Sequence, residues 1–474
     1  MSLPRHNARE SVLRGMRLLL GATATLALAS CASYRPAPLT DAGGASDIQH
    51  LHAPDTADIS RRLPAHRFDP SDGLDVTEVA MLAVANSPQL KLMRDKLGVK
   101  QAQAFAAGLL PDPQLSLNLD FPDSGSSSLT SAFGLGLSQD LGALLTRPSR
   151  VSSANASRRQ ARLDLLWAEW QTIAHARLLF DQIRYQQMRQ RRLRRELDTI
   201  TPLTTRIDQA LTRGDLDYAA ANTGLDAAAG IRKQLGDTER QLEVDQHALR
   251  QLLGLAPDVD LVLVGKAWTP QPTDAQINRA LTRLVARRPD LLALKAGYAA
   301  QEADVRAAIL GQFPAIQVGI TRARDTSAVY TSGFTIGITL PLFNRNRGNI
   351  AIARATRRQL ADSYHERLLA TRSDVHRLRQ ALRLLGRQQP AVERHARKLD
   401  AAATAATANW RAGRLDWPTW LSIRSSALNA DLDRYDLHEQ QVKAALALQT
   451  LLGGDWTDLP ASSVPPTPTA QQSP

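Results

Sequence analysis

The sequence predicts a mainly α-helical protein with membrane β-strands. It is built from two tandem repeats, and the strands of three copies form a β-barrel of about twelve strands that continues into a long α-helical barrel. Three observations predict this fold. The composition is rich in alanine, leucine and arginine with only 5% aromatic residues, which favours helix over a large aromatic core. Residues 87–108 match residues 288–309, which indicates an internal repeat. Each repeat contains two short segments in which apolar and polar residues alternate, which is typical of β-strands.

The N-terminus predicts export. Residues 1–30 begin with a polar, arginine-bearing stretch and end with an apolar run that is too short to span a membrane, so we expect a signal peptide. The run ends at Cys31, the single cysteine, in a pattern typical of a lipid-modified bacterial protein. We expect lipidation of Cys31 rather than an ordinary buried cysteine. Because Ala32 rather than an aspartate follows, we expect sorting to the outer membrane of a Gram-negative bacterium. Residues 31–74 read as a linker.

The repeat sets the domain boundaries. Pro113 corresponds to Pro314, 201 residues later, and RGDLDY at 213–218 corresponds to AGRLDW at 412–417. We therefore expect a first repeat over 75–255, a linker over 256–273, a second repeat over 274–454 and a disordered tail over 455–474.

Each repeat reads as helix, strand, strand, long helix, helix. A glycine-free run such as 149–212 would be about 95 Å long as one helix. Pro202 and Pro390 are positions where the long helices could kink. The predicted helices are 75–110 and 274–312 before the strands, 149–212 and 345–412 after them, and 215–254 and 414–453 returning.

The predicted strands lie at about 113–121, 132–140, 314–322 and 331–341. Their length suits a tilted transmembrane strand, and the polar positions are small, as suits a water-filled lumen. A soluble hairpin packed on a core is the alternative. In the membrane interpretation the lipid-facing residues are Leu115, Leu117, Leu119, Phe133, Leu135, Leu137, Ile316, Val318, Ile320, Phe334, Ile336 and Ile338.

Four strands in one chain cannot form a membrane barrel alone. Every backbone N–H and C=O in hydrocarbon must be paired, so an open sheet cannot lie in a bilayer. The smallest barrels need about eight strands. We therefore expect several copies to share one barrel embedded in outer-membrane lipid. Three copies, a homotrimer, would give about twelve strands and a lumen wide enough for water, with the long helices around the same axis as the strands.

The whole pattern resembles the TolC family of outer-membrane efflux ducts over about residues 75–454. The marks are the duplicated unit, the openings NSPQL at 86–90 and RRPDL at 287–291, and ITLPLFNRNRGNIAIARA at 338–355. The words LPLFNRNRG look closer to the heavy-metal branch, of the CusC and CzcC type. The first repeat departs from the family at this point, because it has LSQDLGALLTRPSR instead.

The resemblance implies an outer-membrane channel that works with a periplasmic adaptor and an inner-membrane pump of the resistance–nodulation–division class. It implies docking of the adaptor on the helix-to-helix turns, although a plain hairpin turn explains the same residues. It also implies acidic residues that restrict the lumen near that end. The docking candidates are Gly214, Leu216, Asp217, Gly413, Leu415 and Asp416, and the gate candidates are Asp208 and Asp400, for which surface charges are the alternative.

The sequence indicates no enzyme, cofactor or metal site. It has no G-x-S-x-G or phosphate-binding loop, and no histidine pair or methionine cluster at helical spacing. The basic run at 190–196 predicts a solvated helix face, not a nucleic-acid partner. We expect passive export of heavy-metal cations, with drugs or dyes as the alternative cargo. A type I secretion duct and a non-channel, periplasm-spanning scaffold are the other hypotheses.

Overall fold

A computed structural model of the chain describes residues 34–39, 43–52, 68–123, 130–265 and 272–453. It divides into two units, Met1–Gly44 and Ala45–Pro474. The described residues of the first unit contain no regular secondary structure. The predicted signal peptide, Cys31, part of the linker that follows it and the C-terminal tail lie outside the described residues.

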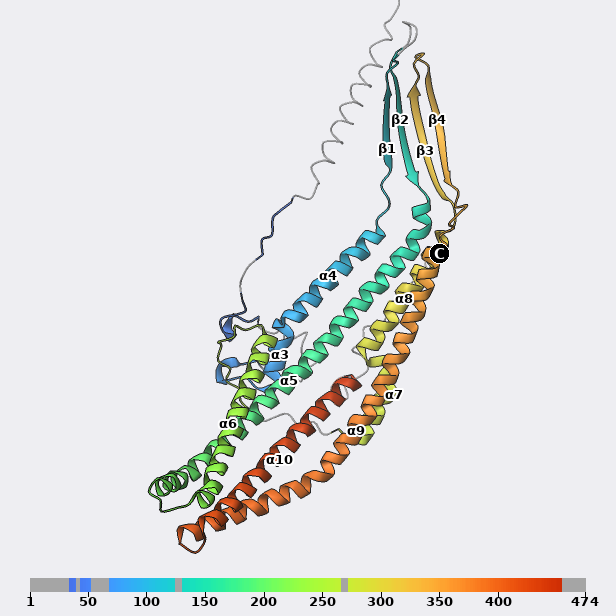
Figure 1. Cartoon of the computed structure of the whole chain (residues 1–474). Coiled ribbons are helices and arrows are strands. Elements are labelled where there is room, and N and C mark those ends of the chain that lie inside the picture. Colours follow the sequence, from blue (N-terminus) through green and yellow to red (C-terminus); the bar gives the residue numbers. More distant parts are fainter. Residues whose placement is uncertain (1–33, 40–42, 53–67, 124–129, 266–271, 454–474) are drawn as a thin grey trace, which may run out of the picture. The chain divides into compact units, whose positions relative to one another are not determined.

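The second unit contains the same order of elements twice (Figure 1). Two short 3-10 helices, η1 (Ile48–His50) and η2 (Pro70–Asp72), come before the first set. The first set is α3 (Val76–Asn86), α4 (Pro88–Gly108), β1 (Gln114–Asp120), β2 (Ala132–Asp140), α5 (Gly142–Thr212) and α6 (Tyr218–Leu253). The second is α7 (Asp274–Arg287), α8 (Pro289–Leu310), β3 (Ala315–Arg324), β4 (Tyr330–Thr339), α9 (Arg347–Arg411) and α10 (Trp417–Leu452).

We expected one continuous helix before each pair of strands. That prediction was wrong, because a proline divides each of these segments into two helices. Ser87 ends α3 with φ −53° and ψ 122°, and Arg288 ends α7 with φ −75° and ψ 118°. A residue before proline is pushed out of the helical region by the proline ring, and Pro88 and Pro289 then start new helices.

The two long helices do continue through their prolines. Helix α5 has 71 residues and contains Pro202, and α9 has 65 residues and contains Pro390. At 1.5 Å per residue they are about 107 and 98 Å long. Figure 1 shows α9 curving along its course without a break.

The four strands form one antiparallel sheet in the order β1-β2-β3-β4. Strand β2 pairs with β3 across the two halves of the chain, with Phe133 opposite Arg324 and Leu137 opposite Ile320. Each strand lies within two residues of its predicted bounds at both ends. Figure 1 shows the sheet beyond the ends of the helices, so helices do not cover its faces.

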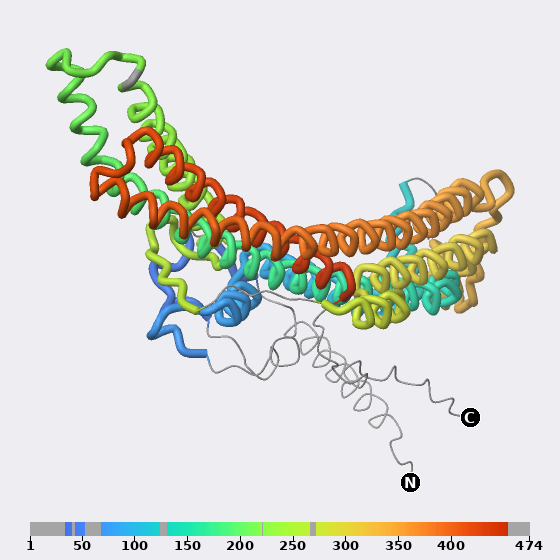
Figure 2. Tube along the Cα trace, turned by 90° about the horizontal axis from the view of Figure 1, so that it is seen from below, coloured from blue at the N-terminus to red at the C-terminus, as the bar shows by residue number. Residues whose placement is uncertain are grey.

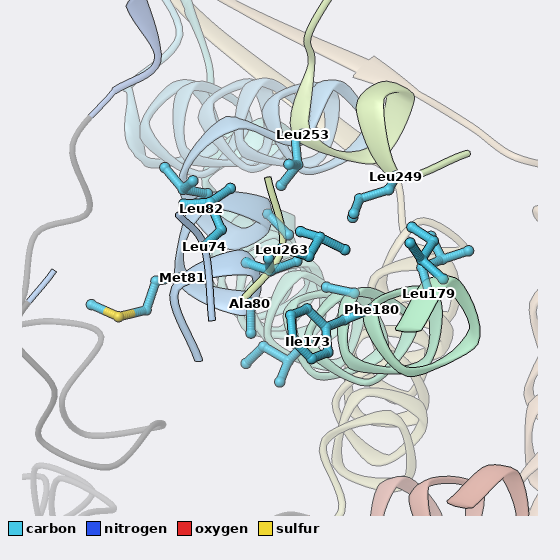
Figure 3. Packing of buried hydrophobic residues seen from close by; sticks show 14 of the residues in the cluster. Leu74, Ala80, Met81, Leu82, Ile173, Leu179, Phe180, Leu249, Leu253 and Leu263 are labelled. Atoms are coloured by element: carbon cyan, nitrogen blue, oxygen red, sulfur yellow. The ribbon is translucent and has the colours of Figure 1, made fainter. Parts of the chain in front are cut away.

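The apolar cores lie among the helices. One core joins α3, α5 and α6 to the segment after α6, and Figure 3 shows Leu74, Phe180, Leu249 and Leu263 pointing into it. A second core joins the end of α5, α6 and α10 around Trp420, where the two helical hairpins lie side by side (Figure 2). Together these cores fix the hairpins and leave the sheet without a core of its own.

Candidate functional site

The large apolar side chains of the sheet share one face, and most of them are exposed to solvent. The register places Leu117 opposite Leu135, Leu137 opposite Ile320, and Val318 opposite Ile336, so the predicted lipid-facing residues share a face. Phe334 is 89% exposed, and only Phe133 of the twelve is less than 36% exposed. Soluble proteins seldom expose so large a continuous apolar surface, so this face requires a partner or a membrane.

The opposite face is polar and made of small residues. A Cβ at Gly319 would come within 2.9 Å of the Leu137 carbonyl, so a larger residue there would displace the neighbouring strand. A Cβ at Gly136 would come within 2.6 Å of Ser116 Oγ, so the Ser116 side chain would have to move. The other residues of this face are Gln114, Ser116, Asn118, Asp120, Gly134, Ser138, Asp140, Gln317, Thr321, Thr331, Gly333, Thr335, Gly337 and Thr339, with Ala132, Ala315 and Ala323.

The sheet has two free edges, β1 and β4, because only β2 and β3 pair on both sides. An edge strand offers unpaired N–H and C=O groups to another chain. The strand hairpins do not pack on the helical cores of the same chain. The alternative of a soluble hairpin packed on a core therefore does not describe this structure. These two edges can therefore become fully hydrogen-bonded by pairing with strands of other chains.

The two helix-to-helix turns have the same geometry. Gly214 and Gly413 have φ of +77° and +69°, the left-handed region that glycine adopts without strain. In the first turn the Asp215 N–H donates to the Ala210 carbonyl at 2.8 Å, and in the second the Arg414 N–H donates to the Asn409 carbonyl at 2.9 Å. These bonds close a Schellman motif at the end of each long helix.

The remaining predicted docking residues divide into exposed and half-buried positions. Leu216 and Leu415 are half-buried against the core around Trp420, so each contributes to packing as well as to the surface. Asp217 and Asp416 are exposed. Asp416 caps α10, because its Oδ1 accepts the Thr419 N–H at 2.8 Å, and this bond lowers the pKa of the Asp416 carboxyl.

The two gate candidates do not form a common site within one chain. Asp208 lies on α5, one turn before its end at Thr212, whereas Asp400 lies about three turns before the end of α9 at Arg411. Both residues are exposed. Measured from their own helix ends they differ in height by about 10 Å, so in an assembly they would form separate rings.

Sequence reasoning missed a buried ion-pair cluster between the two halves. Glu196 of α5 has a side chain only 1% exposed. Its two carboxylate oxygens accept hydrogen bonds from Nε and Nη2 of Arg424 on α10, each at 2.7 Å. Arg192 donates a further hydrogen bond to the same carboxylate at 2.7 Å. Arg192 also donates to Asp431 at 2.9 Å. We expected residues 190–196 to form a solvated helix face. This prediction was wrong at Arg192 and Glu196, whose side chains are largely buried.

The cluster holds an aromatic pair in place. Trp420 is fully buried and stacks on Trp410 with 4.2 Å between the ring centroids. Its indole N–H donates to Thr407 at 3.1 Å, and the Arg424 guanidinium lies 5.5 Å from its centroid. The tryptophans were visible in the sequence, but the pairing of α5 with α10 that encloses them was not.

The described part of the chain lacks both a clustered metal site and a membrane-spanning helix. Among those residues, no group of three or more His, Cys, Asp or Glu side chains is placed to hold a metal ion. Across the same residues, every helix lacks a stretch both long enough and apolar enough for a membrane span.

The comparisons with known proteins agree with this geometry. Residues 280–454 match the family model described as outer membrane efflux protein. This match covers most of the second half of the chain. The chain is 27% identical over 433 residues to the pyoverdine export outer membrane protein OpmQ of Pseudomonas putida, covering 85% of this chain and 90% of OpmQ. It is also 27% identical over 258 residues to the outer membrane protein OprJ of Pseudomonas aeruginosa, covering 51% of this chain and 53% of OprJ.

Solved structures of outer-membrane channels share the fold of this chain. CusC has a TM-score of 0.66 at 18% identity and covers 83% of this chain and 96% of its own. The channel OprN has a TM-score of 0.67 at 18% identity and covers 90% of this chain and all of its own. The predicted TolC-like fold is therefore confirmed.

Proposed function

We propose that this protein is the passive outer-membrane channel of a tripartite efflux system. The observation that carries the proposal is the four-stranded sheet with one exposed apolar face, one face of small polar residues and two free edges. Three copies would supply about twelve strands, enough to close a barrel with a wet lumen. The apolar face would then meet lipid, and the polar face would line the passage.

The helices extend this passage away from the membrane. Helices α5 and α9 continue from the ends of β2 and β4, and at about 100 Å they are long enough to carry the lumen far beyond a bilayer of about 30 Å. The turns at Gly214 and Gly413 are the distal tips. We place the adaptor at these tips, with Leu216, Asp217, Leu415 and Asp416 as its contacts and with the inner-membrane pump beyond it. Cys31 would add a lipid anchor on the membrane side.

The support for the cargo favours small organic solutes. OpmQ is named for pyoverdine export and covers most of this chain, whereas the likeness to CusC shows the fold alone. Among the described residues, no cluster of three or more His, Cys, Asp or Glu side chains is placed to hold a metal ion. Heavy-metal cations, which the sequence led us to expect, remain the alternative cargo. The segment LPLFNRNRG favours them. In that case the pump and the adaptor would select the cation.

Two experiments test this function. Purified protein in planar bilayers should give discrete conductance steps, and absence of conductance from an assembled oligomer, even after loosening of the tips, would refute the channel. A deletion strain should become sensitive to dyes and other organic toxicants. A strain that loses tolerance only to copper, silver, zinc, cobalt or cadmium would instead assign metal cations as the cargo.

A further inference from the structure

The apolar face of the sheet carries two arginines that break its pattern. Arg322 and Arg324 are in β3 and, by the strand register, on the same face as Ile316, Val318 and Ile320. A charged side chain in contact with hydrocarbon is costly at mid-membrane and cheap only near the headgroups. The positions of these two residues along the strand therefore matter.

Both arginines are at the loop end of the sheet. The last row across the face runs Leu119, Phe133, Arg324, Tyr330, and the next runs Leu117, Leu135, Arg322, Ser332. Adjacent rows on one face are two residues apart, about 7 Å. The Arg322 side chain can thus extend its charged group to the level of Arg324, because an arginine keeps its guanidinium in water while its apolar stem lies along apolar surface.

The row of Arg324 has the aromatic residues that mark a membrane interface. Phe133 and Tyr330 flank Arg324 and approach each other edge to face at 6.2 Å. The Arg324 guanidinium lies 5.8 Å from the Phe133 centroid and donates to the Ser131 carbonyl at 2.6 Å. Aromatic rings at this level form the girdle of membrane barrels. The sheet therefore places Arg324 at headgroup depth.

Neither arginine has its charge compensated within the described residues. The ion pairs of those residues include neither Arg322 nor Arg324, and Arg322 is exposed. The nearby Asp325 uses its carboxylate in the loop, where Oδ1 accepts the N–H groups of Ser327 and Val329. The only charged residues on the opposite face are Asp120 and Asp140, so the two faces carry opposite charge.

We propose that Arg322 and Arg324 form a binding site for the phosphate group of an anionic lipid at the loop end of the barrel. The two arginines are two residues apart on one face of the strand, about 7 Å along the backbone, and each guanidinium can form charge-assisted, two-point hydrogen bonds with phosphate oxygens. The exposed leucine and phenylalanine side chains of the rows below would contact the acyl chains of the same lipid. This inference rests on the proposed function, because it requires the apolar face to lie in lipid.

The test compares lipid retention by the full-length protein and by R322Q/R324Q. Each is incubated in mixed micelles with diphosphorylated lipid A or with its dephosphorylated form, and bound lipid is counted by native mass spectrometry. The matched control is R358Q/R372Q, which removes the same charge from exposed positions on α9. We expect R322Q/R324Q to retain the phosphorylated lipid about tenfold less than the parent, or weaker still. The control should match the parent, and the dephosphorylated lipid should bind all three alike.

Two further arms keep the outcomes separate. Millimolar inorganic phosphate should not displace the lipid, and displacement would reassign the site to free phosphate. A nitroxide at Leu117→Cys reports whether the apolar face lies in lipid, through relaxation by oxygen rather than by a water-soluble nickel complex. Lipid exposure of this label with unchanged lipid retention in R322Q/R324Q would overturn the inference and leave the channel intact. Water exposure of the label would overturn both.

Discussion

Glu196→Gln tests whether the buried ion-pair cluster holds the two helical hairpins together. The substitution keeps the size of the side chain and removes the charge that three hydrogen bonds from Arg424 and Arg192 share. The site is almost completely enclosed, because the Glu196 side chain is 1% exposed and the two arginine side chains are 16% and 14% exposed. Breaking such a pair leaves uncompensated buried charge and costs about 3–5 kcal/mol.

The matched control is Glu239→Gln. Glu239 accepts from Arg194 at 2.7 Å, but its side chain is 42% exposed, so its loss should cost under about 1 kcal/mol. Amide hydrogen exchange in α10 between Trp420 and Asp431 is the assay. A loss of 3–5 kcal/mol from local opening corresponds to about a hundredfold or greater fall in protection. Equal exchange in the two variants would refute the conclusion that the buried cluster stabilises this contact.

Three further predictions follow from the sheet and the turns. Ile336→Lys, on the apolar face, should remove the protein from the alkali-washed membrane fraction, since lysine there costs about 2–4 kcal/mol. The Thr335→Lys protein, altered on the polar face, should stay in that fraction. Loss of both variants alike would contradict the assignment of faces. Gly413→Ala should lower the free energy of unfolding by about 1 kcal/mol, because Gly413 has a positive φ. Gly348→Ala in α9 should not lower it, because a Cβ at Gly348 meets no atom within 4 Å. Thermal unfolding measures both changes. Asp416→Asn should destabilise the protein at neutral pH. Because folding lowers the pKa of Asp416, this difference should vanish as the pH falls through that lowered pKa, and a pH-independent difference would contradict the charge effect.

The sequence predicted most of the fold because its strongest signals are local. Alternation places Leu115, Leu117 and Leu119 on one side of a strand whatever that strand pairs with. The glycine and aspartate of each RGDLD or AGRLD segment specify a helix end and the start of the next helix, and the structure has both. The break at Pro88 was also readable, since proline restricts the residue before it, but the helical periodicity on both sides obscured it.

What the sequence could not predict depends on which distant segments meet. Glu196 and Arg424 are 228 residues apart, and nothing near either residue identifies its partner. The register that aligns Phe133 and Arg324 joins the two repeats and requires β2 to pair with β3. The two arginines of β3 obey the alternation, so only the sheet shows that they share a face with the leucines of β1. The docking and gate residues stay predictions, because their partners belong to other chains.

The central claim is that three copies share one closed barrel through the free edges β1 and β4. Within one chain these edges are separated by β2 and β3, about 14 Å apart, so no disulfide can join them. The direct measurement is disulfide cross-linking in native membranes with Ser116→Cys on β1 combined in turn with Thr331→Cys, Thr335→Cys or Thr339→Cys on β4. The account predicts that one pairing gives covalent dimers and trimers and nothing larger. Monomer alone for every pairing, or a ladder that continues beyond the trimer, would contradict it.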